Sequence, residues 1–283
     1  MMNQSEALRL TEAYQQFEAG ECIEAVKGLR EFAERVDDPW TKAELLYHQV
    51  VFLAQMDDAV QARSCFNELT RAVGLVLPKP VADTSDDTPS TNLAVMVRYA
   101  ELKTLLAERN QVQALQVLED LVSRYPAQLS GPASEILNDI DLNHGFLLAD
   151  AARWSEAKPF LERAHPPEVW KSVVCYYLGH AYFESREYER AKEKLLEALH
   201  LGLSVDWEGR AHYVLGLVEY HLGEMRAARD QLELCVKTAD PRYLGASRIW
   251  EWLEAVSRAL GLKADAEKYR RLRVASETNS KPH

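Results

Sequence analysis

The residues that most readily bind metal ions or act as nucleophiles are scattered along this chain. Among its eight histidines, His212 and His221 form the closest grouping on one predicted helix, and they are nine residues apart. That spacing is too long for two ligands of one metal on a single helix. The cysteines contain no CxxC pair, so they predict neither a zinc site nor a redox motif. We expect them to be small buried side chains of a reducing compartment: Cys22, Cys65, Cys175 and Cys235.

Carboxylates are abundant, but they alternate with basic side chains along helix faces. In the stretch 186–197, four glutamates are interleaved with Arg186, Arg190, Lys192 and Lys194. Opposite charges four residues apart stabilise an exposed helix and need no catalytic explanation. Glycine-rich phosphate loops and the HExxH, GxSxG and calcium-loop patterns do not occur. The sequence therefore predicts a protein that is not an enzyme and has no cofactor and no metal.

The composition favours a folded, acidic protein. Hydrophobic residues make up 47% of the 283, which excludes global disorder, and the formal net charge is -11. Residues 1–150 carry 12 Lys and Arg against 24 Asp and Glu, whereas residues 151–283 carry 21 against 20. Such a surface makes nucleic acid and anionic membranes poor partners. With neither a signal peptide nor a membrane-spanning stretch expected, we predict a cytoplasmic location.

A short pattern recurs seven times: a turn-forming pair, three further residues, then alanine. The alanines are separated by steps of 37, 52, 43, 34, 37 and 38 residues. A period in this range indicates a solenoid of stacked units rather than one globular core. The seven alanines are Ala25, Ala62, Ala114, Ala157, Ala191, Ala228 and Ala266.

Apolar residues recur with helical periodicity along nearly the whole chain, and strand-like alternation is scarce. The sequence therefore predicts an all-α fold of antiparallel helix pairs joined by short turns. We expect two pairs in 1–76, a Pro-, Asp- and Thr-rich flexible insertion in 77–91, five further pairs with a polar C-terminal cap in 92–276, and a disordered tail in 277–283.

Two central copies carry a fuller motif. Cys175-x-x-Leu178-Gly179-x-x-Tyr182 is followed by Ala191-x-x-x-Leu195-x-x-Ala198, and the next copy runs from His212 through Leu215-Gly216 to Glu219, then Ala228-x-x-x-Leu232. The chain resembles the tetratricopeptide-repeat (TPR) family in these copies and, more weakly, along nearly its whole length. The resemblance implies a right-handed α-solenoid in which Gly and Ala allow close crossing of the paired helices.

The basic cluster near the C-terminus, Lys268-Tyr269-Arg270-Arg271-Leu272-Arg273, replaces apolar positions of the last second helix. A basic cluster is one way to contact nucleic acid. A polar capping helix explains it better, because the last repeat has no successor to cover it and the chain is acidic overall.

The resemblance also implies that the first helix of each pair lines a concave groove. Aromatic and arginine side chains there suit a binding hot spot. The same rings could instead pack between neighbouring first helices as core, and the pattern favours neither reading. The candidate partner-binding residues are Tyr99, Lys103, Asn143, Phe146, Tyr176, His180, Phe183, Arg210, Tyr213, Tyr220, Arg248 and Trp252.

The leading functional prediction is a non-enzymatic scaffold or adaptor that binds a protein or peptide in this groove. The alternative is a structural module that self-associates into a homo-oligomer through its terminal units. A third hypothesis is an enzyme whose active site lies in the concave groove, but the sequence shows no set of catalytic residues that would support it. Fold alone does not decide among these.

Overall fold

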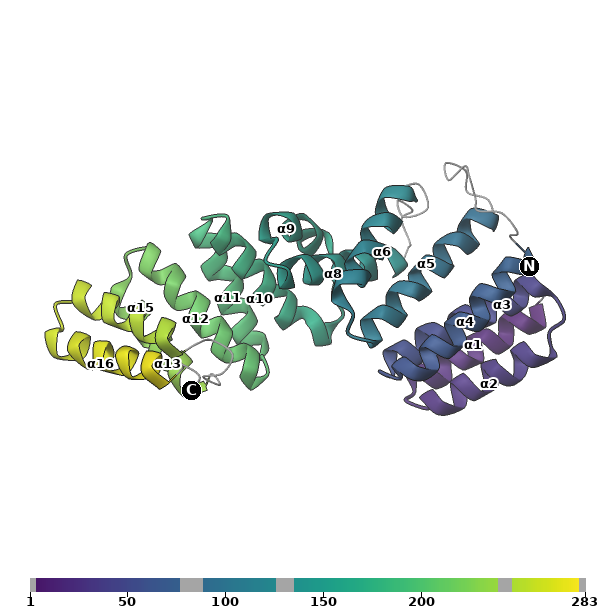
Figure 1. Ribbon diagram of the computed structural model, residues 1–283, viewed down its shortest axis with the longest axis horizontal. Coiled ribbons are helices and arrows are strands. Elements are labelled where there is room, and N and C mark those ends of the chain that lie inside the picture. The colour runs from purple at the N-terminus through teal and green to yellow at the C-terminus, as the bar shows by residue number, and fades with distance from the viewer. Residues whose placement is uncertain (1–3, 77–88, 126–134, 239–245, 280–283) are drawn as a thin grey trace. The chain divides into compact units, whose positions relative to one another are not determined.

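The computed structural model describes residues 4–76, 89–125, 135–238 and 246–279 (Figure 1). Within these ranges there are fourteen α-helices and no strands, so the predicted all-α class is confirmed. The predicted insertion 77–91 lies outside the described residues except for its last three, because α5 already begins at Pro89. Proline at the first helical position loses no hydrogen bond, which suits this start.

The chain divides into two compact units, residues 1–137 and 138–283. The boundary therefore does not coincide with the predicted insertion. In the first unit, each helix packs on its neighbours in the sequence, and α5 also packs on α3. Its helices are α1 (Gln4–Glu18), α2 (Cys22–Arg35), α3 (Pro39–Gln55), α4 (Ala59–Val76), α5 (Pro89–Ala107) and α6 (Gln111–Arg124).

In the second unit, the packing again follows the order of the helices from α9 to α16. The first helices α10, α12 and α15 also contact one another in turn, as stacked pairs require. The helices are α8 (Glu135–Asp150), whose first turn holds the unit boundary, α9 (Trp154–Arg163), α10 (Glu168–Glu184), α11 (Tyr188–Leu201), α12 (Val205–His221), α13 (Met225–Thr238), α15 (Ala246–Ala259) and α16 (Lys263–Asn279). None of the helices in the described ranges has the length and apolar character needed to cross a bilayer.

The turn inside each helix pair has the same backbone geometry. Between α10 and α11, the amide of Arg186 donates to the carbonyl of Phe183, and the amide of Glu187 donates to that of Tyr182. These two bonds form a Schellman motif, which ends a helix on a residue with positive φ. All seven turns have this pair of bonds. The positive-φ residues are Gly20, Asp57, Arg109, Ala152, Arg186, Gly223 and Gly261.

The repeated alanine follows directly from this turn. Its amide donates to the carbonyl of the second turn residue, as Ala191 does to Glu187, and so forms the first hydrogen bond of the next helix. The alanine side chains are fully buried in six copies, and Ala266 is 7% exposed. The alanine thus marks the start of the second helix at the point where it packs against the first.

A glycine in the first helix also lets the two paired helices approach closely. The residue that faces it on the second helix is a leucine. A β-carbon on Gly179 would stand 2.6 Å from Cγ of Leu195, and one on Gly216 would stand 2.8 Å from Cγ of Leu232. Gly145 faces Leu161 in the same way. Three successive pairs of the second unit therefore share one helix crossing.

The positive-φ turns give a prediction for stability. Gly223→Ala is expected to lower the free energy of unfolding by about 1 kcal/mol, because an alanine at φ 81° is strained. Gly28→Ala is the matched control, since Gly28 lies inside α2 with open space around its β-position. That change is expected to raise stability by about 0.5–1 kcal/mol. Urea unfolding followed by circular dichroism measures both changes. If both variants shifted the free energy of unfolding in the same direction, the role given to the positive φ of Gly223 would be contradicted.

The last helix, α16, has an exposed polar face. Arg270 and Arg271 lie near Glu267 at 3.8 and 3.1 Å, and Arg273 pairs with Glu254 at 3.3 Å. The three arginines of the basic cluster are thus held in ion pairs within the final helix pair, in keeping with the capping interpretation. The helix continues to Asn279, so residues 277–279 of the predicted disordered tail are helical.

Candidate functional site

An open groove of about 490 Å³ lies in the second unit, along its first helices. The end of α8, the start of α9, and the helices α10, α12 and α15 contribute to its lining. The first helices stack in register because each pair repeats the same turn and crossing. Their side chains at equivalent positions therefore face the same groove.

Aromatic rings form most of the groove wall. The ring of Trp207 on α12 lies 5.2 Å from that of Tyr176 and 5.4 Å from that of Tyr177, both on α10. The ring of Trp154, at the start of α9, lies 3.9 Å from the imidazole of His180 in a tilted arrangement. Tilted and edge-to-face arrangements are the favoured geometries of aromatic pairs, so these contacts stabilise the packing of the rings in the wall.

Burial fixes the protonation of the polar groups in this wall. It raises the pKa of Tyr176 to about 12 and lowers the pKa of His180 to about 4. Burial, the negative charge of Asp150 and the hydrogen bond to it raise the pKa of Tyr177. The Tyr177 hydroxyl donates to Oδ1 of Asp150 at 2.8 Å. At neutral pH the imidazole and both phenols are uncharged.

The groove also carries two arginines. The guanidinium of Arg210 lies over the ring of Trp207, with Cζ 4.9 Å from the centroid. Arg248 is exposed and forms no ion pair with any residue in the described ranges. The carboxylates of Asp150 and Glu184 line the same groove. Asp150 is engaged by Tyr177, whereas Glu184 and Arg248 are exposed, so a ligand meets one carboxylate and one guanidinium most openly.

The structure brings half of the sequence-predicted site residues together in this groove. They are Tyr176, His180, Phe183, Arg210, Tyr213 and Arg248. Tyr176 is only 5% exposed, so its ring is part of the core and of the groove wall at the same time. The sequence left open whether such a ring faces the groove or packs in the core, and Tyr176 does both.

The other predicted residues of the second unit lie outside the groove lining. Phe146 packs against Tyr177 at 4.9 Å, and Asn143 donates to the carboxylate of Asp139 at 2.8 Å. Tyr220 and Trp252, whose rings are 5.2 Å apart, pack on the core cluster between α12, α13, α15 and α16. A core role accounts for these two rings.

Tyr99 and Lys103 belong to the first unit. Tyr99 is buried, its ring lies 6.3 Å from that of Tyr47, and the ammonium of Lys103 lies 5.7 Å from the Tyr99 ring. Here too the aromatic side chain packs between neighbouring first helices.

Sequence reasoning missed Trp154, Tyr177 and Trp207, which line the groove beside the predicted residues. Trp154 lies on a second helix, and only first helices were considered. Tyr177 and Trp207 lie on first helices but outside the assumed register positions. A search for aromatic residues within one turn of each predicted position would have found Tyr177 and Trp207.

The potential metal ligands and the thiols of the described residues are separated or buried. No group of three or more His, Cys, Asp or Glu side chains there could hold a metal ion. All four cysteines are free, and burial raises the pKa of Cys65 and Cys235 to about 12 and that of Cys175 to about 11. These three thiols are protonated at neutral pH and are weak nucleophiles.

Comparison with the models of known protein families gives no match, and comparison with curated proteins gives no relative. Several solved structures are similar in fold. The apo form of RapI has a TM-score of 0.54 at 13% identity, over 99% of this chain and 78% of that one. MamA AMB-1 has a TM-score of 0.50 at 14% identity, over 65% of this chain and 99% of that one.

A signal-transduction ATPase with a tetratricopeptide-repeat sensor, from Pyrococcus horikoshii, is similar at a TM-score of 0.55 and 14% identity. The match covers 94% of this chain and 41% of that protein. At these identities the comparison is one of fold. The helices pack in pairs, the seven turns within the pairs are equivalent, and the similar solved structures share this arrangement. The chain therefore has the tetratricopeptide-repeat fold.

Proposed function

We propose that this protein is a non-enzymatic binding module whose second unit holds a short segment of another protein in the aromatic groove. The single observation that carries the proposal is the groove itself, in which aromatic rings and two arginines line an open cavity of about 490 Å³. Aromatic and arginine side chains dominate the energetics of protein interfaces. TPR folds typically serve as scaffolds that bind proteins or peptides, which agrees with this reading.

The lining favours a segment in which an apolar side chain stands next to an acidic one. The rings of Trp207 and Tyr213 offer apolar surface, and Arg210 and Arg248 offer charged donors. A guanidinium binds a carboxylate through two parallel hydrogen bonds, which would fix the direction of the segment.

Panning a library of displayed peptides against the full chain tests the proposal. We expect enrichment of peptides with an aromatic or aliphatic residue beside Asp or Glu. The double change Tyr213→Ala with Arg248→Ala is expected to weaken binding of an enriched peptide about thirtyfold or more, since each hot-spot truncation costs about 1–2 kcal/mol.

Arg226→Ala is the matched control, because Arg226 is an exposed arginine on the second helix α13, away from the groove lining. It should bind the peptide as the unchanged protein does. Circular dichroism should show the same helix content in all variants. Unaltered binding by the double variant would remove the groove assignment.

A further inference from the structure

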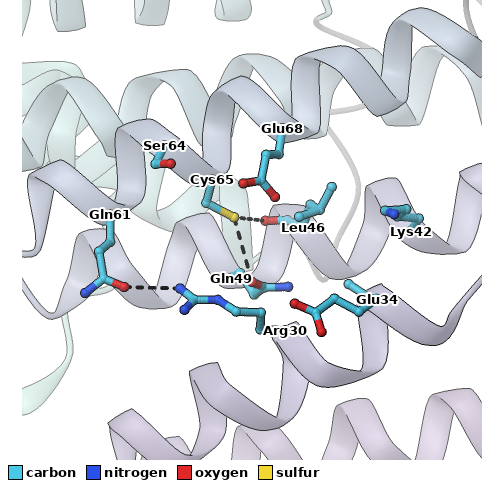
Figure 2. Close-up of a pocket in the computed structure, with 10 residues that line it drawn as sticks. Arg30, Glu34, Lys42, Leu46, Gln49, Gln61, Ser64, Cys65 and Glu68 are labelled. Atoms are coloured by element: carbon cyan, nitrogen blue, oxygen red, sulfur yellow. Dashed lines mark hydrogen bonds between the residues drawn. The ribbon is translucent and has the colours of Figure 1, made fainter.

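A second cavity, of about 420 Å³, lies in the first unit (Figure 2). The second helices α2 and α4 form its sides, and one face of the first helix α3 lies between them. It is therefore lined mainly from second helices, whereas the groove of the proposed function is lined mainly from first helices. The residues that carry the argument are Arg30, Glu34, Lys42, Gln49, Cys65 and Glu68.

Gln49 is a buried polar side chain with an unsatisfied donor. It is 2% exposed, and among the described residues its Nε2 has no hydrogen-bond partner. Its Oε1 faces the Sγ of Cys65 at 3.9 Å, and that thiol also lies 3.6 Å from the carbonyl oxygen of Leu46. A buried amide N–H without a partner costs about 1–3 kcal/mol. A ligand atom that accepts from Nε2 would recover this energy.

Cys65 takes no chemical part in such a site. Burial raises the pKa of its thiol to about 12, so the sulfur keeps its proton at neutral pH and serves as a weak donor. Its Sγ lies beside one end of the Gln49 amide, and Gln49 is among the residues that line the cavity (Figure 2).

The charges around the cavity are balanced. Arg30 and Lys42 supply two cations, and Glu34 and Glu68 supply two carboxylates. Lys42, Glu34 and Glu68 form no ion pair with any residue in the ranges that the structure covers, and Arg30 donates to Oε1 of Gln61 at 3.1 Å. Both signs are therefore available to a ligand.

This arrangement selects one class of ligand by charge. A simple anion would meet two carboxylates, and a simple cation would meet Arg30 and Lys42. Few apolar side chains line the cavity, which argues against an apolar ligand. A molecule with a carboxylate for Gln49 and the basic groups, and an ammonium for the glutamates, satisfies all of them.

We propose that this cavity binds a free α-amino acid, whose carboxylate accepts from Nε2 of Gln49 and whose ammonium group faces Glu34 and Glu68. The cavity volume lies within the range of about 300–1,000 Å³ that small-molecule sites occupy. The site lies in a different unit from the groove, and its ligand is independent of the partner proposed there.

Titration calorimetry of the full chain with each of the common α-amino acids tests the proposal. We expect at least one to bind with a Kd below about 1 mM, which corresponds to a modest affinity for a small polar ligand. The N-acetylated form and the carboxamide form of the same amino acid should bind at least about tenfold more weakly, because each lacks one of the two charges.

Two variants locate the site. Gln49→Met keeps the length of the side chain and removes the amide, and Glu68→Gln removes one charge at an exposed position. Each is expected to weaken binding about tenfold or more. Lys27→Met, on an exposed part of α2 outside the cavity lining, is the matched control and should leave the Kd unchanged.

The proposal is overturned if no amino acid binds, or if the acetylated or carboxamide form binds as well as the free amino acid. Tighter binding of a dipeptide would assign the cavity to a peptide instead. If Gln49→Met loses helix content, the test rests on Glu68→Gln. An unchanged Kd for the amino acid in that variant would refute the proposed site.

Discussion

Leu195→Ala is expected to lower the free energy of unfolding by about 3 kcal/mol. The side chain of Leu195 is fully buried between α10 and α11, and its Cγ lies 2.6 Å from where a β-carbon of Gly179 would stand. Truncation removes the burial of the leucine and leaves a cavity that two rigid helices cannot close. The loss in chemical denaturation midpoint, at an unchanged m-value, measures the cost.

The opposing glycine makes this prediction specific to the helix crossing. Gly179→Ala should cost about 1–3 kcal/mol, because the new methyl group would stand 2.6 Å from Cγ of Leu195. In the double variant, the alanine methyl fills part of the space that the leucine leaves. Its total cost is therefore expected to be smaller than the sum of the two single costs, by about 1–2 kcal/mol.

Gly74→Ala is the control for this cycle, since Gly74 is exposed in α4 and its β-position has open space around it. It should leave stability unchanged or raise it slightly. Additive costs for Gly179 and Leu195 would show that the two residues do not share the crossing that the structure gives them.

The stability of the second unit is expected to depend on the charge of Glu219. This glutamate is 3% exposed, on α12, and its Oε2 has no hydrogen-bond partner among the described residues. Burial raises the pKa of Glu219 to about 7, against the opposing effect of Lys192, whose Nζ lies 4.0 Å from Oε1. In the equivalent position of the preceding pair, Tyr182 donates to Glu162 at 2.7 Å and carries no charge.

The sign of the effect follows from proton linkage. Unfolded chains hold a glutamate pKa near about 4.3, so between about pH 4.5 and 7 the folded protein keeps a proton that the unfolded one releases. The stability that this proton confers is fully present below the unfolded pKa. It falls as the pH rises above the unfolded pKa and is fully lost by about pH 7, above which the buried carboxylate is charged.

Glu219→Gln removes this titration. The variant should have almost the stability of the unchanged protein at pH 5 and exceed it at pH 8 by about 2 kcal/mol, allowing for screening by water and Lys192. Thermal melts at the two pH values measure the difference. Glu193→Gln, at an exposed position on α11, is the control. If the difference in stability between Glu219→Gln and the unchanged protein were the same at both pH values, Glu219 would not be the group that titrates.

Much of the fold was predictable because the pattern is local. A turn pair, three residues and an alanine are enough to specify a Schellman motif and the first bond of the next helix. Those bonds depend on residues close in sequence, so the period could be read without knowledge of the tertiary structure. The positive φ at Arg186 or Ala152 was less evident, since neither residue favours it.

The candidate groove was only partly predictable. Helical periodicity identifies the apolar face of a first helix, but it does not tell which side chains on that face line the groove and which pack in the core. Tyr176 and Tyr220 have equivalent aromatic character, yet Tyr176 lines the cavity and Tyr220 packs on the core cluster. The difference depends on which rings the next helix pair brings against them. Trp154 and Trp207, which come from neighbouring pairs, supply that contact for the groove.

The cavity of the first unit could not be read from the sequence at all. Gln49 occupies a position where α3 would ordinarily place an apolar side chain, and a polar residue there gives no periodic signal. Its significance depends on an unsatisfied amide hydrogen and on charges from two other helices, which only tertiary packing brings together.

The seven Schellman turns also bear on how this chain reaches its native state. Each is closed by bonds between residues a few positions apart, so a helix pair loses little loop-closure entropy when it forms. Contacts of this kind give a low contact order, which is associated with fast folding. We therefore expect nucleation to be possible in whichever helix pair closes first, with order spreading to adjoining pairs as they stack.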